Sequence, residues 1–306
     1  MEDTTTVPRP AEQGQPKRNA FKRVIDFYRL EARYTNDCIV LVLSNFTSDL
    51  FTNIGIVIYP FLGGLEILRH GDYKYFLISY LVTYLVEFVC VAFLYFVFLF
   101  PFTLAAYSIL GPIGFPLAIV HGIQFSNLVA CHELRRDKVR GSLNLLRLTF
   151  TRHKMSTVLL TPDTMHLRPE DRAIPWSHYL KSLEFWCGAL PTMVLQYLIA
   201  IAIFCVWYVI SLLPVIGVLL LKFHTSPHRG FDYVLPFYRD IRQYDKHALT
   251  RIYYGGYARW LLLGASTGIL ESIPILAGVA VCTNQIGCTL WEISMVRDHQ
   301  AKKKPI

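Results

Sequence analysis

Charged residues are scarce in this sequence. Asp, Glu, Lys and Arg together make up 17% of the 306 residues, whereas hydrophobic residues make up 53%. The mean hydropathy is correspondingly positive, at +0.37. A water-soluble domain of this size needs more charge to cover its surface, so the composition argues against a soluble protein. It predicts an integral membrane protein instead.

Motifs that bind nucleotides or metals are missing as well. The sequence contains no P-loop, no H-E-x-x-H zinc motif and no C-x-x-C pair. Its seven cysteines are odd in number and nearly all lie inside apolar runs, which predicts buried thiols and no disulfide framework or zinc site. We therefore expect a non-enzymatic protein that needs no cofactor and no metal.

The net charge of +8 raises the question of a nucleic-acid partner. However, the Lys and Arg residues flank apolar blocks and do not alternate with stacking aromatic residues on a compact domain. This placement favours attraction to anionic lipid headgroups over binding of nucleic acid. Membrane lipids are therefore the predicted partners.

The first residues are polar and rich in proline. Residues 1–18 have little to bury, so we predict a disordered tail and no cleavable signal peptide. Residues 19–35 are predicted to form a basic amphipathic helix on the membrane surface, although a helix packed on a neighbour has the same pattern. The apolar residues on one face of that helix are Phe21, Val24, Ile25 and Tyr28.

Four apolar blocks follow, and the last three contain long runs without Lys or Arg. The first, residues 38–68, is interrupted by acidic residues, so we expect an interfacial or partly inserted segment. Its sequon at Asn45 lies in apolar surroundings, which disfavours glycosylation. The longest block, residues 75–131, would form a helix of roughly 85 Å, far more than the ~30 Å hydrocarbon core, so two crossings or insertions are expected. The other blocks are residues 185–221 and 257–293.

Proline and glycine interrupt each of the last three blocks near its middle. Proline removes a helical hydrogen bond and glycine permits a tight turn, so these interruptions predict the turns of half-inserted helical hairpins. The predicted turns lie near Pro101 or at Gly111-Pro112, at Pro214 with Gly217, and at Pro274 with Gly278.

The polar regions between the blocks carry an excess of Lys and Arg. By the positive-inside bias, we expect the basic loops 133–182 and 222–259 and the basic tail 294–306 on the cytosolic side. Every apolar block must then return to the side from which it entered. We therefore predict an all-α integral membrane protein with a single membrane domain, residues 38–293, built from long transmembrane helices and proline-broken, half-inserted hairpins. Such hairpins need to pack on each other, on the longest block or on a second copy of the chain.

Three polar side chains inside these blocks are candidate site residues: Glu87, Glu271 and Asn284. Polar and ionisable groups at membrane depth are costly and mark functional sites by default. Two interpretations stay open for Glu271. It lines a solute pathway with Asn284, or it has a structural role, in which it caps the broken helix before Pro274 or pairs with a neighbouring hydroxyl such as that of Ser272. A negative Glu271 counts against anion transport, and Glu87 fits a structural role as well as a functional one.

Two further patterns lie in the polar regions. His228 and Asp232 lie in the segment TSPHRGFD and His224 directly precedes it, and we interpret this cluster as part of a solvated interfacial loop. Lys303 and Lys304 occupy the fourth and third positions from the end, which matches a cytosolic di-lysine signal for retrieval to the endoplasmic reticulum.

Short motifs in the second half of the chain are similar to those of a known family. They lie at residues 212–217, 268–275 and 283–291, with Tyr238 and the basic stretch up to Arg251 between them. In these residues the sequence resembles the etoposide-induced protein 2.4 family, which includes bacterial CysZ sulfate permeases. Within that family it looks most like the fungal branch of lipid-droplet and outer-spore-wall proteins. The resemblance is strongest over residues 185–293 and weaker over residues 65–133.

The resemblance implies an α-helical membrane domain with half-inserted hairpins. It also implies residence at the endoplasmic reticulum and lipid droplets, or at the spore or prospore membrane, with a family member or a second copy as partner. The implied role is assembly of the spore wall and its dityrosine layer during sporulation. Two functional classes therefore remain: a non-enzymatic protein that organises a membrane or lipid-droplet surface, and a permease for a small solute or anion.

Overall fold

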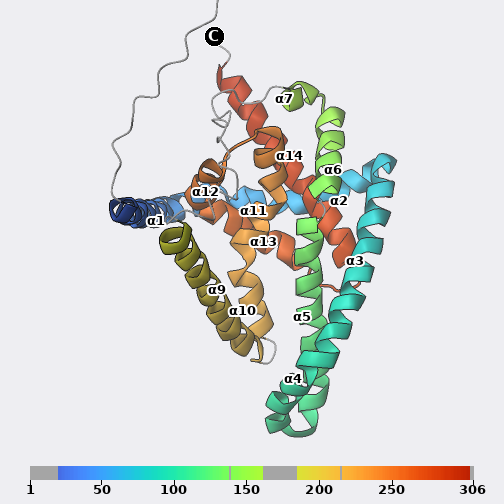
Figure 1. Ribbon diagram of the computed structural model, residues 1–306. Helices are drawn as coiled ribbons and strands as arrows, with labels where there is room; N and C mark the ends of the chain where they lie inside the picture. The colour runs from blue at the N-terminus through green and yellow to red at the C-terminus, as the bar shows by residue number, and fades with distance from the viewer. Residues whose placement is uncertain (1–19, 138, 161–184, 214–215, 304–306) are drawn as a thin grey trace, which may run out of the picture. The chain divides into compact units, whose positions relative to one another are not determined.

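The computed structural model describes residues 20–137, 139–160, 185–213 and 216–303 (Figure 1). All regular elements in these ranges are helical, so the predicted all-α fold is confirmed. The predictions for residues 1–18 and for Lys304 lie outside the described residues. The α-helices are α1 (Ala20–Thr52), α2 (Tyr59–Arg69), α3 (Lys74–Leu94), α4 (Phe100–Tyr107), α5 (Gly114–Asp137), α6 (Val139–Arg152), α7 (Ser156–Leu160), α9 (Leu190–Ser211), α10 (Ile216–His224), α11 (Ser226–Pro236), α12 (Lys246–Gly255), α13 (Tyr257–Leu270) and α14 (Ala277–Lys303).

The chain divides into two compact units. One comprises residues 1–36 and 172–200, and the other comprises residues 37–171 and 201–306. Helices α1 and α9 pass from one unit into the other. In the first unit, the hydroxyl of Tyr28 donates a hydrogen bond of 3.1 Å to the carbonyl oxygen of Cys187. The second unit contains all three candidate polar residues that the sequence places inside apolar blocks.

Helix α1 is longer than the surface helix predicted for residues 19–35. It continues to Thr52 because no proline or glycine interrupts the chain before Gly55. The side chains of Ile25 and Tyr28 are exposed.

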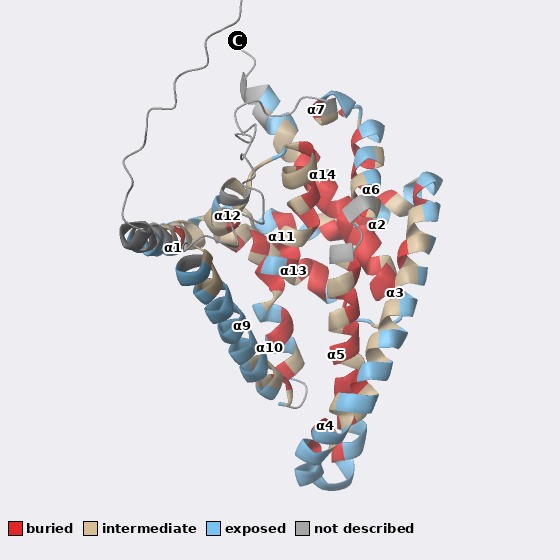
Figure 2. Ribbon diagram, in the orientation of Figure 1, coloured by how far each residue is buried: buried red, intermediate tan, exposed pale blue. Residues whose placement is uncertain are grey.

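Two stretches of the described chain are helical, long and apolar enough to cross a membrane: Gly71–Arg135 and Phe185–Ser211. The segments Ala32–Thr52 and Ile54–Arg69, which are bent by 62° relative to each other, add a third if they form one span. Large hydrophobic side chains of α3, α4 and α9 are exposed, as the pale-blue ribbon in Figure 2 shows. Such surfaces are compatible with lipid and unfavourable in water. The predicted long apolar helices are therefore confirmed.

The stretch Gly71–Arg135 is a helical hairpin. Helix α3 continues through a π-helical turn, Tyr95–Leu99, into α4, and α5 returns alongside α3 (Figure 1). The reversal lies at Ser108–Ile113, where Gly111 has a positive φ of 65° that glycine adopts without strain. At Pro101, the alternative turn position, the helix continues, and Pro101 is the second residue of α4, which directly follows the π-helical turn.

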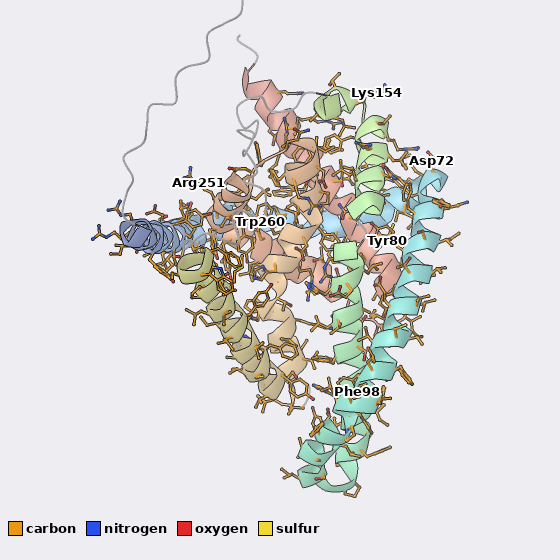
Figure 3. The ribbon with its side chains drawn as sticks, viewed as in Figure 1. Asp72, Tyr80, Phe98, Lys154, Arg251 and Trp260 are labelled. Atoms are coloured by element: carbon orange, nitrogen blue, oxygen red, sulfur yellow. The ribbon has the colours of Figure 1, made fainter. Side chains whose placement is uncertain are left out.

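The two ends of this hairpin differ in polarity. At the open end, Asp72 and Arg152 form a partly exposed ion pair. At the closed end, Ile109 is 88% exposed and Ile113 is 67% exposed. Figure 3 labels Asp72 near the open end and Phe98 towards the closed end. The closed end therefore needs an apolar environment, whereas the open end is suited to water.

Helix α14 lies at the centre of the second unit. It contacts α2, α3, α5, α6, α11 and α13, and nearly all of its residues from Ala277 to Ile293 are buried (Figure 2). Its apolar side chains therefore pack against protein. Neither α13 nor α14 is among the helices of the described chain that are long and apolar enough to span a membrane. The half-inserted hairpin expected for residues 257–293 stays a prediction.

The chain breaks between α13 and α14 where the sequence predicts a break. Residues 271–276 form the turn between the two helices, and Pro274 lies within it. Proline cannot donate the hydrogen bond that a continuous helix would require at this position. The corresponding Pro214 lies outside the described residues.

Gly217 and Gly278 have a different role from the predicted one, because each is the second residue of a helix. A Cβ atom on Gly278 would lie 2.8 Å from the Cβ of Tyr84, and one on Gly217 would lie 2.2 Å from the carbonyl oxygen of Ile210. These glycines permit close packing between segments and do not form the turns themselves.

The two basic stretches expected as loops are largely helical where the structure describes them. Residues 133–182 include α6 and α7, and residues 222–259 include α11 and α12. Asp245 caps α12 by accepting a hydrogen bond of 2.8 Å from the amide of Ala248. In the same way, the expected tail from residue 294 belongs to α14 as far as Lys303. The basic composition of these stretches indicated exposure to solvent. Their helices, however, also have apolar faces that pack on other parts of the second unit.

Helices α2 and α14 cross with their backbones in contact. A Cβ atom on Gly63 would lie 2.1 Å from the carbonyl oxygen of Thr283, and one on Gly287 would lie 2.2 Å from that of Tyr59. Small residues permit this close approach and are typical of helix interfaces in membrane proteins.

We expect Gly63→Ala to lower the free energy of unfolding by about 1–3 kcal/mol, because the added methyl group forces the two helices apart. The adjacent Gly64 is a matched control, since no atom lies within 4 Å of a Cβ atom there. We expect Gly64→Ala to leave stability unchanged or to raise it by about 0.5–1 kcal/mol. Unfolding of the purified proteins in detergent, followed by circular dichroism, measures both effects. Equal losses for the two variants would contradict the backbone contact.

Candidate functional site

One face of α5 carries a row of polar side chains along the helix. These residues follow one another at spacings of three, three, four and four positions, which places them on one side of a helix. All have buried or half-buried side chains, and α5 contacts α10, α11 and α14. The residues of this polar stripe are His121, Gln124, Asn127, Cys131 and Arg135.

The polar stripe meets a buried carboxylate at Glu271, the residue that follows α13. Nη1 of Arg135 donates a hydrogen bond of 2.6 Å to Oε2 of Glu271, and the two side chains are only 4% and 5% exposed. The hydroxyl of Tyr233 and the amide of Asn284 donate to the other oxygen, Oε1, and the bond from Asn284 measures 2.9 Å. We name Glu271, Arg135, Arg229, Tyr233 and Asn284 the Glu271 cluster.

Arg229 brings a second positive charge to the Glu271 cluster. Its Nε lies 3.7 Å from Oε2 of Glu271, and its Nη1 donates a bond of 3.2 Å to the carbonyl oxygen of Gly264. Gly268 makes room for this guanidinium, because a Cβ atom there would lie 1.9 Å from Nη1 of Arg229. Gly268 of α13 therefore admits the arginine of α11, and the carbonyl group of Gly264 accepts a hydrogen bond from it.

The Glu271 cluster surrounds its carboxyl group with donors only. Burial and the adjacent charge of Glu271 raise the pKa of Tyr233 well above its ordinary value, so the Tyr233 hydroxyl keeps its proton and donates. Asn127 of the polar stripe donates a bond of 2.8 Å to the backbone carbonyl oxygen of Glu271. An ionised carboxylate can only accept hydrogen bonds, so this arrangement suits the charged form of Glu271.

A third cation, Lys222 of α10, lies beside the cluster. Its Nζ donates bonds of 3.2 Å to Oε1 of Gln124 and of 3.2 Å to Oγ of Ser272. Burial and the nearby charge of Arg229 lower the pKa of Lys222 below its ordinary value. Among the described residues, no carboxylate forms an ion pair with Lys222. Three buried cations therefore surround the one carboxylate of Glu271.

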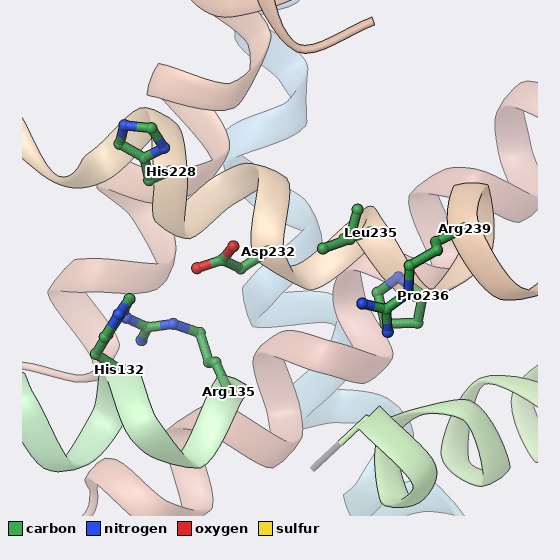
Figure 4. A pocket seen from close by; sticks show the side chains of 7 residues that line it. All are labelled: His132, Arg135, His228, Asp232, Leu235, Pro236 and Arg239. Atoms are coloured by element: carbon green, nitrogen blue, oxygen red, sulfur yellow. The ribbon is translucent and has the colours of Figure 1, made fainter. Parts of the chain in front are cut away.

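Two cavities adjoin the Glu271 cluster. The first has a volume of 460 Å³, and Figure 4 shows Asp232 of α11 facing His132 and Arg135 of α5 across it. The second has a volume of 270 Å³ and contains the side chain of Lys222. We name them the arginine cavity, lined by His132, Arg135, His228, Asp232, Leu235, Pro236 and Arg239, and the lysine cavity, lined by Tyr107, Leu117, Val120, His121, Gln124, Val218, Leu219, Lys222 and Ser272.

The structure brings two of the three candidate polar residues together. Glu271 and Asn284 are hydrogen-bonded in the cluster, whereas Glu87 lies half-buried on α3, outside the cluster. The expected pairing of Glu271 with Ser272 is wrong, because the hydroxyl of Ser272 donates a bond of 2.7 Å to the carbonyl oxygen of Gly268. The carboxylate of Glu271 contacts arginines, which lower its electrostatic energy more than a hydroxyl can.

Sequence reasoning missed Arg135, Arg229 and Tyr233, which it assigned to basic cytosolic loops. A signal for Arg135 did exist, because this residue continues the spacing of the polar stripe at the end of an apolar block. Arg229 and Tyr233 are four residues apart on α11, but nothing in their surroundings indicates burial. Their place depends on contacts between segments that are distant in the sequence.

The segment TSPHRGFD is helical and not the loop that the sequence indicated, although His224 and His228 are exposed, as expected for solvated side chains. The segment forms the start of α11, and most of that helix is buried. The ring of His228 stacks on that of Tyr253 with centroids 5.1 Å apart, and the ring of His224 stacks on that of Trp207 at 4.1 Å. His228 and Asp232 line the arginine cavity.

Two short patterns typical of enzymes occur in this region, and neither has the geometry that its chemistry needs. His132 and Asp137 match H-x-x-x-x-D, but both belong to α5, where positions five apart are separated by about 140° around the helix axis. Gly264, Ser266 and Gly268 match G-x-S-x-G, whose serine requires a sharp turn between a strand and a helix. Ser266 instead lies inside α13, is buried and donates to a backbone carbonyl group.

Comparison with known proteins finds similarity to outer spore wall proteins of Saccharomyces cerevisiae. Outer spore wall protein LDS1 is 30% identical over 254 residues, which cover 82% of this chain and 74% of LDS1. Outer spore wall protein LDS2 is 27% identical over 271 residues, covering 87% of this chain and 76% of LDS2. Outer spore wall protein RRT8 is 25% identical over 272 residues, covering 86% of this chain and 78% of RRT8. No family model and no solved structure matches the chain.

These comparisons support one part of the resemblance found in the sequence. They support the spore-wall branch, and they do not support the wider etoposide-induced protein 2.4 and CysZ family.

Glu292 of α14 is a buried carboxyl group of a different kind from Glu271. It is 1% exposed, and neither of its oxygens has a hydrogen-bond partner among the described residues. Burial raises the pKa of Glu292 well above its ordinary value, although Arg242 opposes the shift. Burial thus favours the neutral form of Glu292, which serves as a matched control for Glu271.

We expect Glu271→Gln to lower the free energy of unfolding by about 3–5 kcal/mol, because Arg135 and Arg229 stay buried without their carboxylate. Glu292→Gln is expected to keep or raise stability at neutral pH, since a neutral amide replaces a carboxyl group that ionises only on unfolding. Unfolding by denaturant in detergent measures both variants. If the two variants lost the same stability, Glu271 would not be the counter-charge of the arginines.

Proposed function

The chain belongs to the family of the outer spore wall proteins of Saccharomyces cerevisiae, and we propose that it supports assembly of the outer spore wall as a non-enzymatic membrane protein. The observation that carries this proposal is the similarity to LDS1, which extends over most of both chains. The names of LDS2 and RRT8 agree with it. The proposed role includes formation of the dityrosine layer during sporulation.

The exposed apolar helices support a site of action within a membrane. The hairpin Gly71–Arg135 and the stretch Phe185–Ser211 expose large hydrophobic side chains along their length. Apolar surface in contact with water raises the free energy of the protein, whereas contact with lipid tails does not. We propose the endoplasmic reticulum and lipid droplets as the locations, with the spore or prospore membrane as a further one. Anionic headgroups would meet exposed basic residues of the chain.

The organisation of the buried polar groups supports a non-enzymatic role. In the Glu271 cluster, the side chains bond to each other and to the backbone, and Glu271 is held by donors from three helices. A catalytic acid or nucleophile needs access to a reacting atom, and these groups are occupied by structural contacts. We therefore propose that the cluster holds the helices of the second unit together.

Deletion of the gene in its own organism tests the proposed role. We expect spores that lack the dityrosine fluorescence of the outer wall, while vegetative growth stays normal. Re-expression of the wild-type chain should restore the fluorescence, and a fluorescently tagged copy should coincide with lipid-droplet and endoplasmic-reticulum markers. Spores with normal fluorescence, in cells from which the protein is absent, would refute the role in wall assembly.

A second candidate function, a permease for a small anion, is favoured by one specific observation. The polar stripe of α5 begins at the lysine cavity and ends at the arginine cavity, and the Glu271 cluster lies along it. The negative charge of Glu271 counted against anions in the sequence, but Arg135 and Arg229 offset it. An excess of buried positive charge at membrane depth is typical of anion pathways.

Flux measurements separate the two candidates. The wall-assembly proposal predicts that vesicles containing the purified protein take up sulfate or chloride at the same rate as empty vesicles. The permease candidate predicts faster uptake that Arg135→Gln reduces and Arg152→Gln does not, because Arg152 lies in the exposed ion pair with Asp72.

A further inference from the structure

The lysine cavity combines apolar walls with a few polar groups. Leu117 and Val120 of α5 and Val218 and Leu219 of α10 form apolar walls, and Lys222 lies among the polar groups of the lining. The volume of 270 Å³ lies slightly below the range of about 300–1,000 Å³ that is typical of small-molecule sites. The cavity therefore has room for one end of an amphiphile and for a short length of its chain.

The cavity opens towards the lipid-facing surface. Val120 is 55% exposed and Leu219 is 59% exposed, although both also line the cavity. A molecule dissolved in the membrane can therefore enter sideways between α5 and α10. An acyl chain bound in this way would leave its far end in the surrounding lipid.

Lys222 is the group that gives the cavity its charge. It is 9% exposed, and both of its hydrogen-bond acceptors, Gln124 and Ser272, are neutral. An ammonium group has three N–H donors, and a buried cation is costly without a counter-charge. The carboxylate of Glu271 is already shared by Arg135 and Arg229.

The histidine of the cavity, His121, is already hydrogen-bonded. Nδ1 of His121 lies 2.7 Å from the hydroxyl of Tyr95, and Nε2 lies 3.1 Å from Oγ of Ser211. Both ring nitrogens therefore have partners, and Lys222 is the cation that an incoming anion would meet.

We propose that the lysine cavity binds a long-chain aliphatic carboxylate, a fatty acid, whose carboxylate accepts a hydrogen bond from Nζ of Lys222. The chain lies between Leu117, Val120, Val218 and Leu219 and continues into the membrane. This ligand supplies the missing negative charge and covers the apolar walls at the same time. The proposal is independent of the role in spore-wall assembly.

The cavity suits a carboxylate better than a phospholipid headgroup. A phosphate group is commonly held by several donors or by the fork of an arginine, whereas this cavity offers one compact ammonium. A glycerophosphate headgroup with two chains also requires more room than a cavity of 270 Å³ provides. The arginines of the Glu271 cluster are engaged with Glu271 and are not part of the lining.

Binding of cis-parinaric acid, a fluorescent fatty acid, to the full-length protein in detergent micelles tests the proposal. We expect saturable binding that oleic acid displaces and that oleyl alcohol displaces at roughly tenfold or higher concentration, because the alcohol lacks the charge-assisted bond. Lys222→Met should weaken binding of the acid by roughly tenfold or more. Lys74→Met, which alters an exposed lysine at the start of α3, is the matched control and should bind as the wild type does.

A second variant keeps the test decisive if Lys222→Met fails to fold. Val120→Trp fills the mouth of the cavity from an exposed position and should abolish binding of the acid without removing the charge. The proposal is overturned by equal displacement by acid and alcohol, or by wild-type binding in a folded Lys222→Met or Val120→Trp variant. Tighter competition by dioleoyl phosphatidic acid than by oleic acid would also overturn it, in favour of a phospholipid headgroup.

Discussion

The pairing of one buried carboxylate with two arginines is the interaction on which the second unit depends. Glu271 follows α13, Arg135 comes from α5, Arg229 from α11 and Asn284 from α14. Breaking a buried ion pair leaves an uncompensated charge and costs several kcal/mol, so none of these helices can move away alone. Helices α11 and α13 have 11 and 14 residues and are too short to cross a bilayer. Their position is therefore set by this pairing and by packing.

The charges meet only because the helix backbones come close together. A Cβ atom on Gly230 of α11 would lie 2.2 Å from the carbonyl oxygen of Trp260, and one on Gly264 of α13 would lie 1.7 Å from that of Ser226. Larger side chains at these positions would separate α11 from α13 and would draw Arg229 away from Glu271. Small residues and ion pairs thus act together: the glycines bring the helices into contact, and the charges make that contact specific.

Composition and the spacing of apolar residues predicted the helical membrane fold, and Pro274 correctly predicted the break after α13. These features depend on local physics, since proline interrupts a helix wherever it occurs in the interior. The burial of Arg229 and Lys222 was not predictable in this way. A basic residue in a polar stretch has the same local signature whether it faces water or a carboxylate from a distant segment. Likewise, Gly278 indicated a turn. The structure instead shows that Tyr84 of α3 packs so close to this position that a side chain would collide with it.

The apolar tip of the hairpin has a consequence for the kind of lipid phase that this protein can enter. From α3 through α4 the outgoing arm is roughly 50 Å long at 1.5 Å per residue, and part of its open end packs on protein. A bilayer offers a hydrocarbon layer of ~30 Å and then water again, which would wet Ile109 and Ile113 at the tip. An oil body under a single phospholipid layer has no second water surface at any depth. The length of the hairpin and its exposed apolar tip therefore set a minimum thickness for the apolar phase that shields the whole hairpin from water.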